Sequence, residues 1–404
     1  MNKKWVFSLK ILGILFVVLY SLMPLVNVVV SRYASTYLYM LLALCLFVEI
    51  VGKDLNYYVS FLLPMIVYEL LIYTNTSNSI IMWGYQALLL ILPIIISVDL
   101  GREGPFEINR TSKVLLFALF VTSLTTIVGC RIYPNAARTL ATISDSQDEL
   151  NVLYSFANIG GYTFVYELVL LYPLLIYAYK RGLLSTSMTV ILSVVVGLVA
   201  ISSEYTTALL LFIISSCLYF VKKDFTIKDA ITLAILGIIF IVIFDTVISS
   251  LLLKLADVIE SDAISYRLET LAGGSEALEA SEDNRILLYG MSLSSFFNSP
   301  LWGKMLGASG SIGGHSQILD ALGNYGLIGG LTLFFIYRRI YNYFYEPVMH
   351  KAGDGYIFWM FFQAVFLSTI NTGLFLEVLA FYGPLLFNVI NLKLEDRNED
   401  LMGR

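Results

Sequence analysis

His315 is the residue of this sequence best suited to acid–base chemistry. It ends a long polar stretch, residues 254–315, and opens an apolar segment, residues 316–331. The chain has only two histidines, and the other, His350, lies among basic residues. A histidine side chain can exchange a proton near neutral pH, so at this place it could act as a general base on a substrate at a membrane surface. Taken alone, it could equally hydrogen-bond a backbone carbonyl or a lipid headgroup.

Four arginines predicted to lie outside the membrane form the second group of candidates. Guanidinium groups bind phosphate oxygens in pairs and stay charged at a surface of low dielectric constant. A lipid-linked pyrophosphate would need at least two of them. The alternative is that each arginine extends to the interface or pairs with one of the many nearby carboxylates. These candidates are Arg131, Arg138, Arg267 and Arg285.

Acidic residues within apolar segments form a third group. A charge inside a membrane is costly and usually serves a function. These residues could relay protons, neutralise the arginines or bind substrate hydroxyls. They are Glu69, Glu167, Asp245, Asp320 and Glu377.

The composition is that of a polytopic helical membrane protein. The chain has 404 residues, of which 58% are hydrophobic and 14% are charged, and its mean hydropathy is +0.79. Apolar runs recur along the whole length, each long enough to cross about 30 Å of hydrocarbon. They are too long and too uniformly apolar for barrel strands. We therefore expect an all-α chain, with residues 1–404 forming one integral membrane domain.

Length and hydropathy predict about twelve transmembrane helices. The expected segments lie near residues 5–30, 34–51, 57–73, 80–98, 113–130, 156–179, 184–202, 205–221, 229–250, 316–337, 355–371 and 374–392.

The distribution of Lys and Arg predicts that both termini are cytoplasmic. With that orientation, eighteen of the 25 basic residues fall in cytoplasmic segments and seven fall outside. The reverse orientation would invert the usual positive-inside bias. The largest extracytoplasmic loop is then residues 251–315, late in the chain. Within it, residues 285–297 are apolar with small polar residues, a composition compatible with a short helix in the interface.

Sequence motifs for several other chemistries are absent. There is no GxxxxGK[ST] phosphate loop, which argues against ATP-driven transport. Neither HExxH nor GxSxG occurs, which argues against zinc proteolysis and against a serine hydrolase of that type. No cysteine pair has CxxC spacing, so neither a metal cluster nor a disulfide framework is indicated. We expect no cofactor.

Residues 284–331 resemble the O-antigen polymerase and O-antigen ligase superfamily. The resemblance rests on an arginine, Arg285, on the turn Ser299-Pro300-Leu301-Trp302-Gly303, and on a segment that opens His315-Ser316-Gln317 and ends in Gly326-Leu327-Ile328-Gly329. One departure is that the turn continues as Gly303-Lys304-Met305-Leu306-Gly307, longer than the compact glycine pair that is usual there. The repeated glycines after position 322 predict close packing behind a site.

The resemblance implies inverting, metal-independent glycosyl transfer between undecaprenyl-pyrophosphate-linked oligosaccharides on the outer face of the cytoplasmic membrane. Arg285 would then bind pyrophosphate, with Arg131, Arg138 or Arg267 as a second cation. His315 would be the general base on the acceptor hydroxyl. The expected partners are membrane lipid and, in capsule or exopolysaccharide synthesis, a chain-length regulator and a flippase; nucleic acid is not expected.

Two alternatives remain open. A ligase shares this chemistry and differs in its acceptor, but nothing in the sequence indicates a lipid-A-core acceptor, so the repeat-unit polymerase is favoured. A polysaccharide flippase or secondary transporter would also have many spans. It would be expected to carry cationic groups within its spans and short outer loops, whereas here the charges within spans are mainly acidic and the outer loop is long.

Overall fold

Every regular element that the structure describes is a helix. The computed structural model describes residues 3–30, 32–51, 55–74, 80–100, 105–134, 136–142, 148–222, 225–243, 254, 285–306, 311–348 and 353–402. These ranges contain α-helices, 3₁₀-helices and π-helices and no strand. The prediction of an all-α membrane protein is confirmed at this level.

Four helical stretches in the described ranges are long and apolar enough to cross a membrane. They are Phe106–Ile132, Tyr162–Lys180, Gln317–Val348 and Glu377–Glu395. The described residues also contain shorter apolar helices, of 10–17 residues each. Each of the twelve segments expected from the sequence overlaps at least one helix, but the number of crossings and the side of the termini stay predictions.

The chain divides into two compact units. Unit 1 comprises Met1–Asp224, Thr332–Val365 and Leu374–Arg404, and unit 2 comprises Phe225–Leu331 and Phe366–Gly373. Two helices, α17 (Gln317–Ile340) and α18 (Asp354–Ile370), contribute residues to both units. Whether the units form the single domain expected from the sequence stays a prediction.

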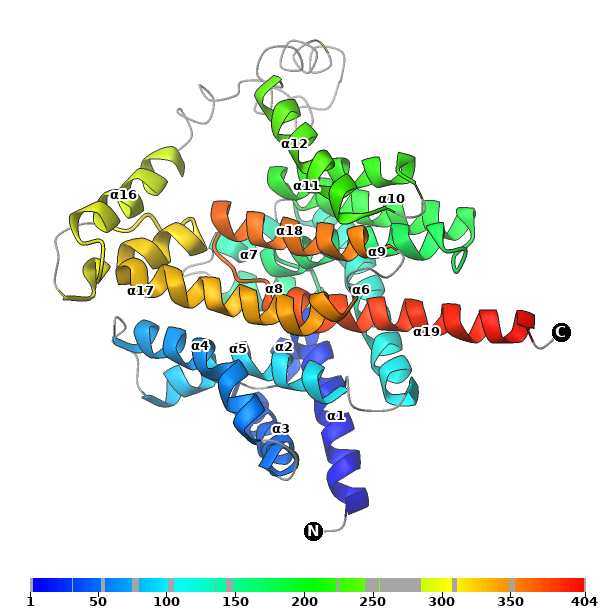
Figure 1. Ribbon diagram of the computed structural model, residues 1–404, viewed down its shortest axis with the longest axis horizontal. Helices are drawn as coiled ribbons and strands as arrows, with labels where there is room; N and C mark the ends of the chain where they lie inside the picture. Colours follow the sequence, from blue (N-terminus) through cyan, green and yellow to red (C-terminus); the bar gives the residue numbers. More distant parts are fainter. Residues whose placement is uncertain are drawn as a thin grey trace. The chain divides into compact units, whose positions relative to one another are not determined.

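Unit 1 contains most of the helices, and Figure 1 labels the larger ones. The first half has α1 (Lys3–Leu22), α2 (Pro24–Val29), α3 (Arg32–Val51), α4 (Leu55–Thr74), α5 (Ile80–Leu100), α6 (Pro105–Ile132), α7 (Ala136–Thr142) and α8 (Asp148–Phe156). It continues with α9 (Tyr162–Lys180), α10 (Thr186–Ser202), α11 (Thr206–Ser216) and η2 (Cys217–Phe220), and later with η5 (Tyr341–Tyr345), η6 (Glu346–Val348), η7 (Glu377–Tyr382) and α19 (Gly383–Met402).

Helix α9 forms the centre of unit 1. It is apolar on all sides, and nearly every residue from Phe164 to Ala178 is buried, as expected for a helix that other helices surround. It packs against α10, α11, α19 and η7. Helix α1 packs against α3 and α6, and α6 also contacts α10 and α19. The first and last thirds of the chain are therefore joined through α6 and α9.

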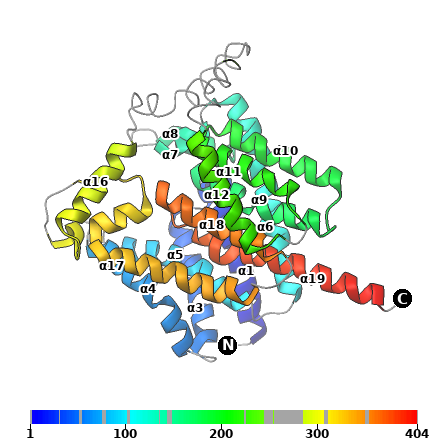
Figure 2. The ribbon, with the colours of Figure 1, turned by 45° about the horizontal axis from the view of Figure 1, so that its top comes forward.

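Unit 2 contains α12 (Ile227–Ile243), α16 (Arg285–Asn298), η4 (Gly303–Leu306), the first part of α17 and the end of α18. Figures 1 and 2 both show α16 beside the start of α17. The resemblance segments, residues 285, 299–303 and 315–329, all fall in this unit.

Candidate functional site

His315 lies in a short loop, residues 311–316, that leads into α17, and its side chain is half-buried. The neighbouring Gly314 has a φ of 73° and is exposed. A Cβ atom added at Gly314 would meet no described atom within 4 Å. Among the described residues, the loop therefore leaves room beside Gly314, the residue that precedes His315.

The carboxylate of Asp320 holds this loop in place. Its Oδ2 accepts the backbone N–H of Ser316 at 3.0 Å, and its Oδ1 accepts the N–H of Gly314 at 3.3 Å. The hydroxyl of Ser292, on α16, donates to the same Oδ1 at 2.5 Å. The two amides flank His315, so Asp320 fixes the backbone on both sides of the imidazole. These contacts do not distinguish among the roles expected for the acidic residues. They show that Asp320 holds the loop in its conformation.

Ser316 caps the N-terminus of α17. Its side-chain oxygen accepts the N–H of Leu319 at 3.0 Å, and its hydroxyl donates to the carbonyl of Thr369 at 2.6 Å. Serine is among the preferred N-cap residues because its oxygen satisfies an N–H that the first turn leaves without a partner. The side chain is fully buried, so this one residue ends the loop, begins α17 and ties both to α18.

The end of α18 receives two more hydrogen bonds. The N–H of Gln317 donates to the carbonyl of Asn371 at 3.0 Å, and the hydroxyl of Tyr289 on α16 donates to the carbonyl of Ile370 at 2.6 Å. The last carbonyls of a helix have no partner within it. At the end of α18, the loop and α16 supply partners for these carbonyls.

Helix α16 packs closely against the loop. The N–H of Gly313 donates to Ser292 Oγ at 3.0 Å, and the hydroxyl of Ser295 donates to the carbonyl of Ser311 at 3.0 Å. A Cβ atom at Gly313 would lie 2.2 Å from the carbonyl oxygen of Leu288. Only glycine permits this approach of two backbones. Ser292 and Ser295 consequently lie on the buried side of α16.

The position of Arg285 is set by the register of α16. Arg285 begins the helix, and Tyr289 and Ser292 follow at the fourth and seventh positions, which places all three on one helix face. That face contacts the loop and α18 through Tyr289 and Ser292. The side chain of Arg285, and the whole of Arg267, lie outside the described residues.

The turn of residues 299–303 packs against a break in α17. Gly326, inside α17, has φ 62° and ψ −150°, which interrupts the helix. The next N–H, that of Leu327, donates to the carbonyl of Pro300 at 2.8 Å. Gly303 has a φ of 57°, and a Cβ there would lie 2.5 Å from the carbonyl oxygen of Gly323. The segments that carry the family resemblance thus assemble against one another.

The glycines of this segment do provide close packing, as expected, but in a different way. A Cβ at Gly323 would lie 2.7 Å from the carbonyl oxygen of Ser292, and one at Gly326 would lie 2.6 Å from that of Pro300. The closely packed partners are α16 and the turn after it. The segment expected as one continuous span near residues 316–337 is broken at Gly326.

Arg131 and Arg138 are exposed and belong to unit 1. Arg131 lies in the last turn of α6 and Arg138 on the short helix α7. Between them, Ala137 is buried, and its carbonyl accepts the hydroxyl of Tyr205 at 2.7 Å. Tyr205 also interacts electrostatically with Arg138. Which of these arginines, if either, completes a pyrophosphate site stays a prediction.

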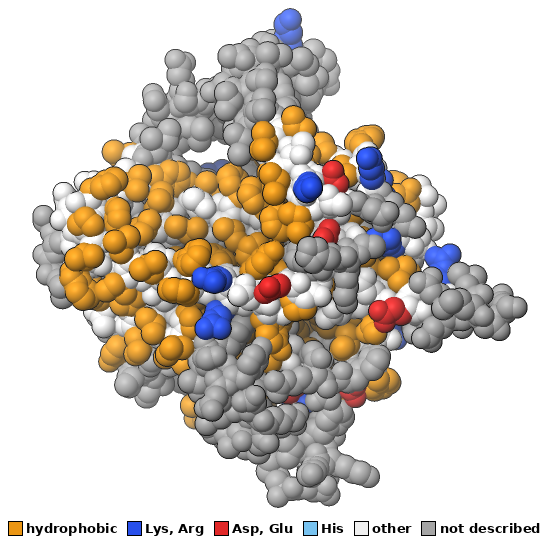
Figure 3. Space-filling model, in the orientation of Figure 1, with side chains coloured by type: hydrophobic (Ala, Val, Ile, Leu, Met, Phe, Trp, Pro, Cys, Tyr) orange, Lys and Arg blue, Asp and Glu red, His pale blue; other side chains and the backbone are white. Residues whose placement is uncertain are grey.

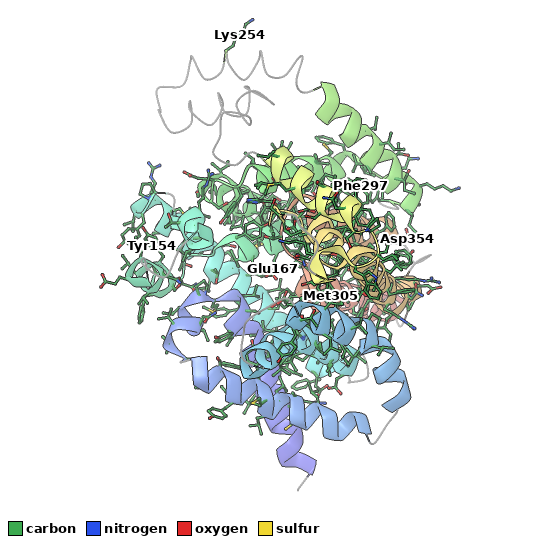
Figure 4. All side chains as sticks on the ribbon, turned by 90° about the vertical axis from the view of Figure 1, so that its left-hand side faces the viewer. Tyr154, Glu167, Lys254, Phe297, Met305 and Asp354 are labelled. Atoms are coloured by element: carbon green, nitrogen blue, oxygen red, sulfur yellow. The ribbon has the colours of Figure 1, made fainter. Side chains whose placement is uncertain are left out.

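Two of the other predicted acidic residues interact electrostatically within unit 1. Glu167 on α9 is 1% exposed, and it interacts electrostatically with Glu377 of η7. Tyr382 interacts with both carboxyl groups and shares a hydrogen bond with the hydroxyl of Ser21. Figure 4 labels Glu167. Glu69 is buried on α4, and Asp245 lies outside the described residues.

A buried ion pair in unit 1 was not predicted. The Nζ atom of Lys10 lies 2.8 Å from Oδ2 of Asp99, and the two side chains are 1% and 5% exposed. Lys10 was counted among the cytoplasmic charges, but it lies on the buried side of α1. The available signal was that Lys10 is the sixth residue of the first expected segment and that Asp99 directly follows the fourth.

Comparison with known proteins adds no further identification: no family model, no curated protein and no solved structure matches this chain.

Proposed function

We propose that this protein is a polysaccharide repeat-unit polymerase. It would join undecaprenyl-pyrophosphate-linked oligosaccharides at the outer face of the cytoplasmic membrane. The observation that carries the proposal is the arrangement around His315. One carboxylate, that of Asp320, binds the amides of Gly314 and Ser316 on either side of the histidine.

The reaction is a single displacement at the anomeric carbon of the donor sugar. The acceptor hydroxyl oxygen forms the new bond to that carbon, while the bond from the carbon to the pyrophosphate oxygen breaks. His315 takes the hydroxyl proton as the bond forms, which is ordinary general-base catalysis. The lipid-linked pyrophosphate leaves with the electron pair, and this step requires compensation of its negative charge.

Arg285 is the residue proposed to supply that compensation. It begins α16 on the helix face that Tyr289 and Ser292 use to contact the loop and α18. A guanidinium group can bind two phosphate oxygens at once and keeps its charge at a membrane surface. Arg131, Arg138 and Arg267 are the candidates for a second cation.

The test is the profile of lipid-linked oligosaccharides in a strain that lacks the gene and carries a variant in its place. With His315→Ala, we expect single repeat units on the lipid carrier at the outer face and no long polymer, although the protein reaches the membrane. His350→Ala, which removes the other histidine, is the matched control and should restore polymer. Undiminished polymer with His315→Ala would contradict the catalytic role.

The same profile separates the competing functions. Repeat units that stall at the inner face would indicate a flippase instead of a polymerase. Normal polymer that fails to reach its final acceptor would indicate a ligase.

A further inference from the structure

Helix α16 buries two of its serines and exposes large apolar side chains, although Ser294 is also exposed. Its serines at 292 and 295 are 0% and 1% exposed, and they bind Asp320 and the loop. Leu287 and Phe297, by contrast, are 60% and 70% exposed. A surface helix in water normally presents its polar side to the solvent. The side of α16 that faces away from the protein is therefore suited to an apolar medium.

The apolar surface continues through the turn and onto α17. Leu301 is 60% exposed and Trp302 is also exposed. The carbonyl of the adjacent Pro300 binds the N–H of Leu327, whose side chain is exposed on α17. Figure 3 shows hydrophobic side chains gathered over α16 and the start of α17, and Figure 4 labels Phe297 on α16 and Met305 in η4. Because α17 is long and apolar enough to cross a membrane, this surface continues the face of a candidate span.

Several backbone groups of the turn have the partners that a lipid environment requires. In hydrocarbon, polar backbone groups must find partners within the protein. The N–H of Ser299 donates to the carbonyl of Phe296 at 3.1 Å, and that of Gly303 donates to the carbonyl of Ser299 at 2.8 Å. Pro300 has no N–H, and its carbonyl is bound by Leu327.

Charged residues mark both ends of this apolar segment. Residues 286–303 contain no charged side chain, and Arg285 and Lys304 stand at the two ends. Helix α16 has 14 residues, so it is about 21 Å long and too short to cross about 30 Å of hydrocarbon. An uncharged segment of this length can lie against the hydrocarbon without crossing it, with its terminal charges at the polar boundary.

We infer that the exposed face of α16 and of the turn after it, residues 286–303, lies in the hydrocarbon of the bilayer without crossing it, so that lipid chains cover Leu287, Phe297 and Leu301. This differs from the expectation of an extracytoplasmic loop that runs from 251 to 315. It brings the polar network of Ser292 and Asp320 to the membrane boundary. The inference does not depend on the proposed reaction.

Spin labels on single cysteines test this placement in the full-length protein in phospholipid vesicles. The three native cysteines, Cys45, Cys130 and Cys217, are replaced by serine, and labels are attached at Leu287→Cys, Phe297→Cys and Leu301→Cys. The measured quantity is the ratio of collisions with oxygen, which concentrates in hydrocarbon, to collisions with a water-soluble nickel chelate. Phe117→Cys, exposed on the candidate span α6, is the lipid reference, and Glu149→Cys, exposed on α8, is the water reference.

We expect all three labels to match Phe117→Cys. Labels that match Glu149→Cys would overturn the inference, because α16 would then lie in water. Labels shielded from both oxygen and nickel would also overturn it, because a protein would then cover this face.

A second measurement keeps the native cysteines and so does not depend on the folding of the cysteine-free variant. A photoreactive benzophenone amino acid replaces Phe297, and the irradiated protein is weighed by mass spectrometry. An added mass equal to a phospholipid supports the inference, whereas cross-linking to another polypeptide or to no lipid contradicts it.

Discussion

The hydroxyl of Ser292 donates to Oδ1 of Asp320 at 2.5 Å, and the same Ser292 oxygen accepts the N–H of Gly313 at 3.0 Å. One serine on α16 thus connects the carboxylate that orders the His315 loop to the backbone of that loop. Because Ser292 is fully buried, water cannot replace either bond if the hydroxyl is removed.

Ser292→Ala should therefore weaken both the loop and the reaction. A hydrogen bond to a charged group contributes about 1.5–3 kcal/mol, and a buried N–H without a partner costs about 1–3 kcal/mol. We expect a lower melting temperature in detergent and much less polymer. Ser294→Ala, on the exposed side of the same helix, is the control and should resemble the wild type in both measurements.

Asp320→Asn separates a role in loop structure from a role in proton transfer. The amide can accept hydrogen bonds through one oxygen only, so it cannot serve Ser292, Gly314 and Ser316 together. We expect the melting temperature and the polymer yield to fall together. If Asp320 instead carried protons, polymer would disappear while the melting temperature stayed unchanged.

Gly326→Ala should be strongly destabilising. The φ of 62° and ψ of −150° at this position are almost confined to glycine, and another residue there costs on the order of 1–3 kcal/mol. The added Cβ would also lie 2.6 Å from the carbonyl oxygen of Pro300. Gly290→Ala, where an added Cβ would meet nothing within 4 Å, is the control, and we expect it to leave the melting temperature unchanged or slightly raised.

Arg285→Lys should be nearly as harmful as Arg285→Ala. Lysine keeps the positive charge but cannot bind two phosphate oxygens with a planar fork. The measurement is the fraction of lipid-linked repeat units converted to polymer. Full activity with lysine would show that simple charge suffices at this position.

The pair of Lys10 and Asp99 predicts a double-mutant result. Removing one partner leaves a buried charge without compensation, which costs about 3–5 kcal/mol. We expect Lys10→Met alone and Asp99→Leu alone to lower the melting temperature or the amount of protein in the membrane. The double variant should recover most of the loss, because apolar replacements of similar volume often stabilise as well as a buried ion pair. A loss in the double variant equal to the sum of the two single losses would mean that the two charges do not depend on each other.

The helical fold could be predicted because apolar runs of membrane length leave few other solutions. The neighbourhood of His315 could be predicted from the residues that carry the resemblance, since Arg285, Pro300 and Gly326 all lie in the elements that assemble around the loop.

Other features could not be predicted, for physical reasons. The break at Gly326 depends on contact with Pro300, which is distant in sequence, so glycine spacing alone indicated a straight helix. The roles of Ser292 and Ser295 depend on which side of α16 is buried, and hydropathy assigns serine no preferred side. The hydrogen bonds of Asp320 to the loop could not be predicted because they join its carboxylate to backbone amides, which no side-chain pattern reveals.

The hydrogen bonds to the end of α18 set an order of events during synthesis. Ser316 and Gln317 bind the carbonyls of Thr369 and Asn371, which leave the ribosome more than fifty residues later. A chain that stops after Val365 would contain Arg285, His315 and Asp320 and still lack the carbonyls that anchor the loop. The nascent protein therefore cannot complete the site until residues 369–371 have been made, long after Arg285, His315 and Asp320.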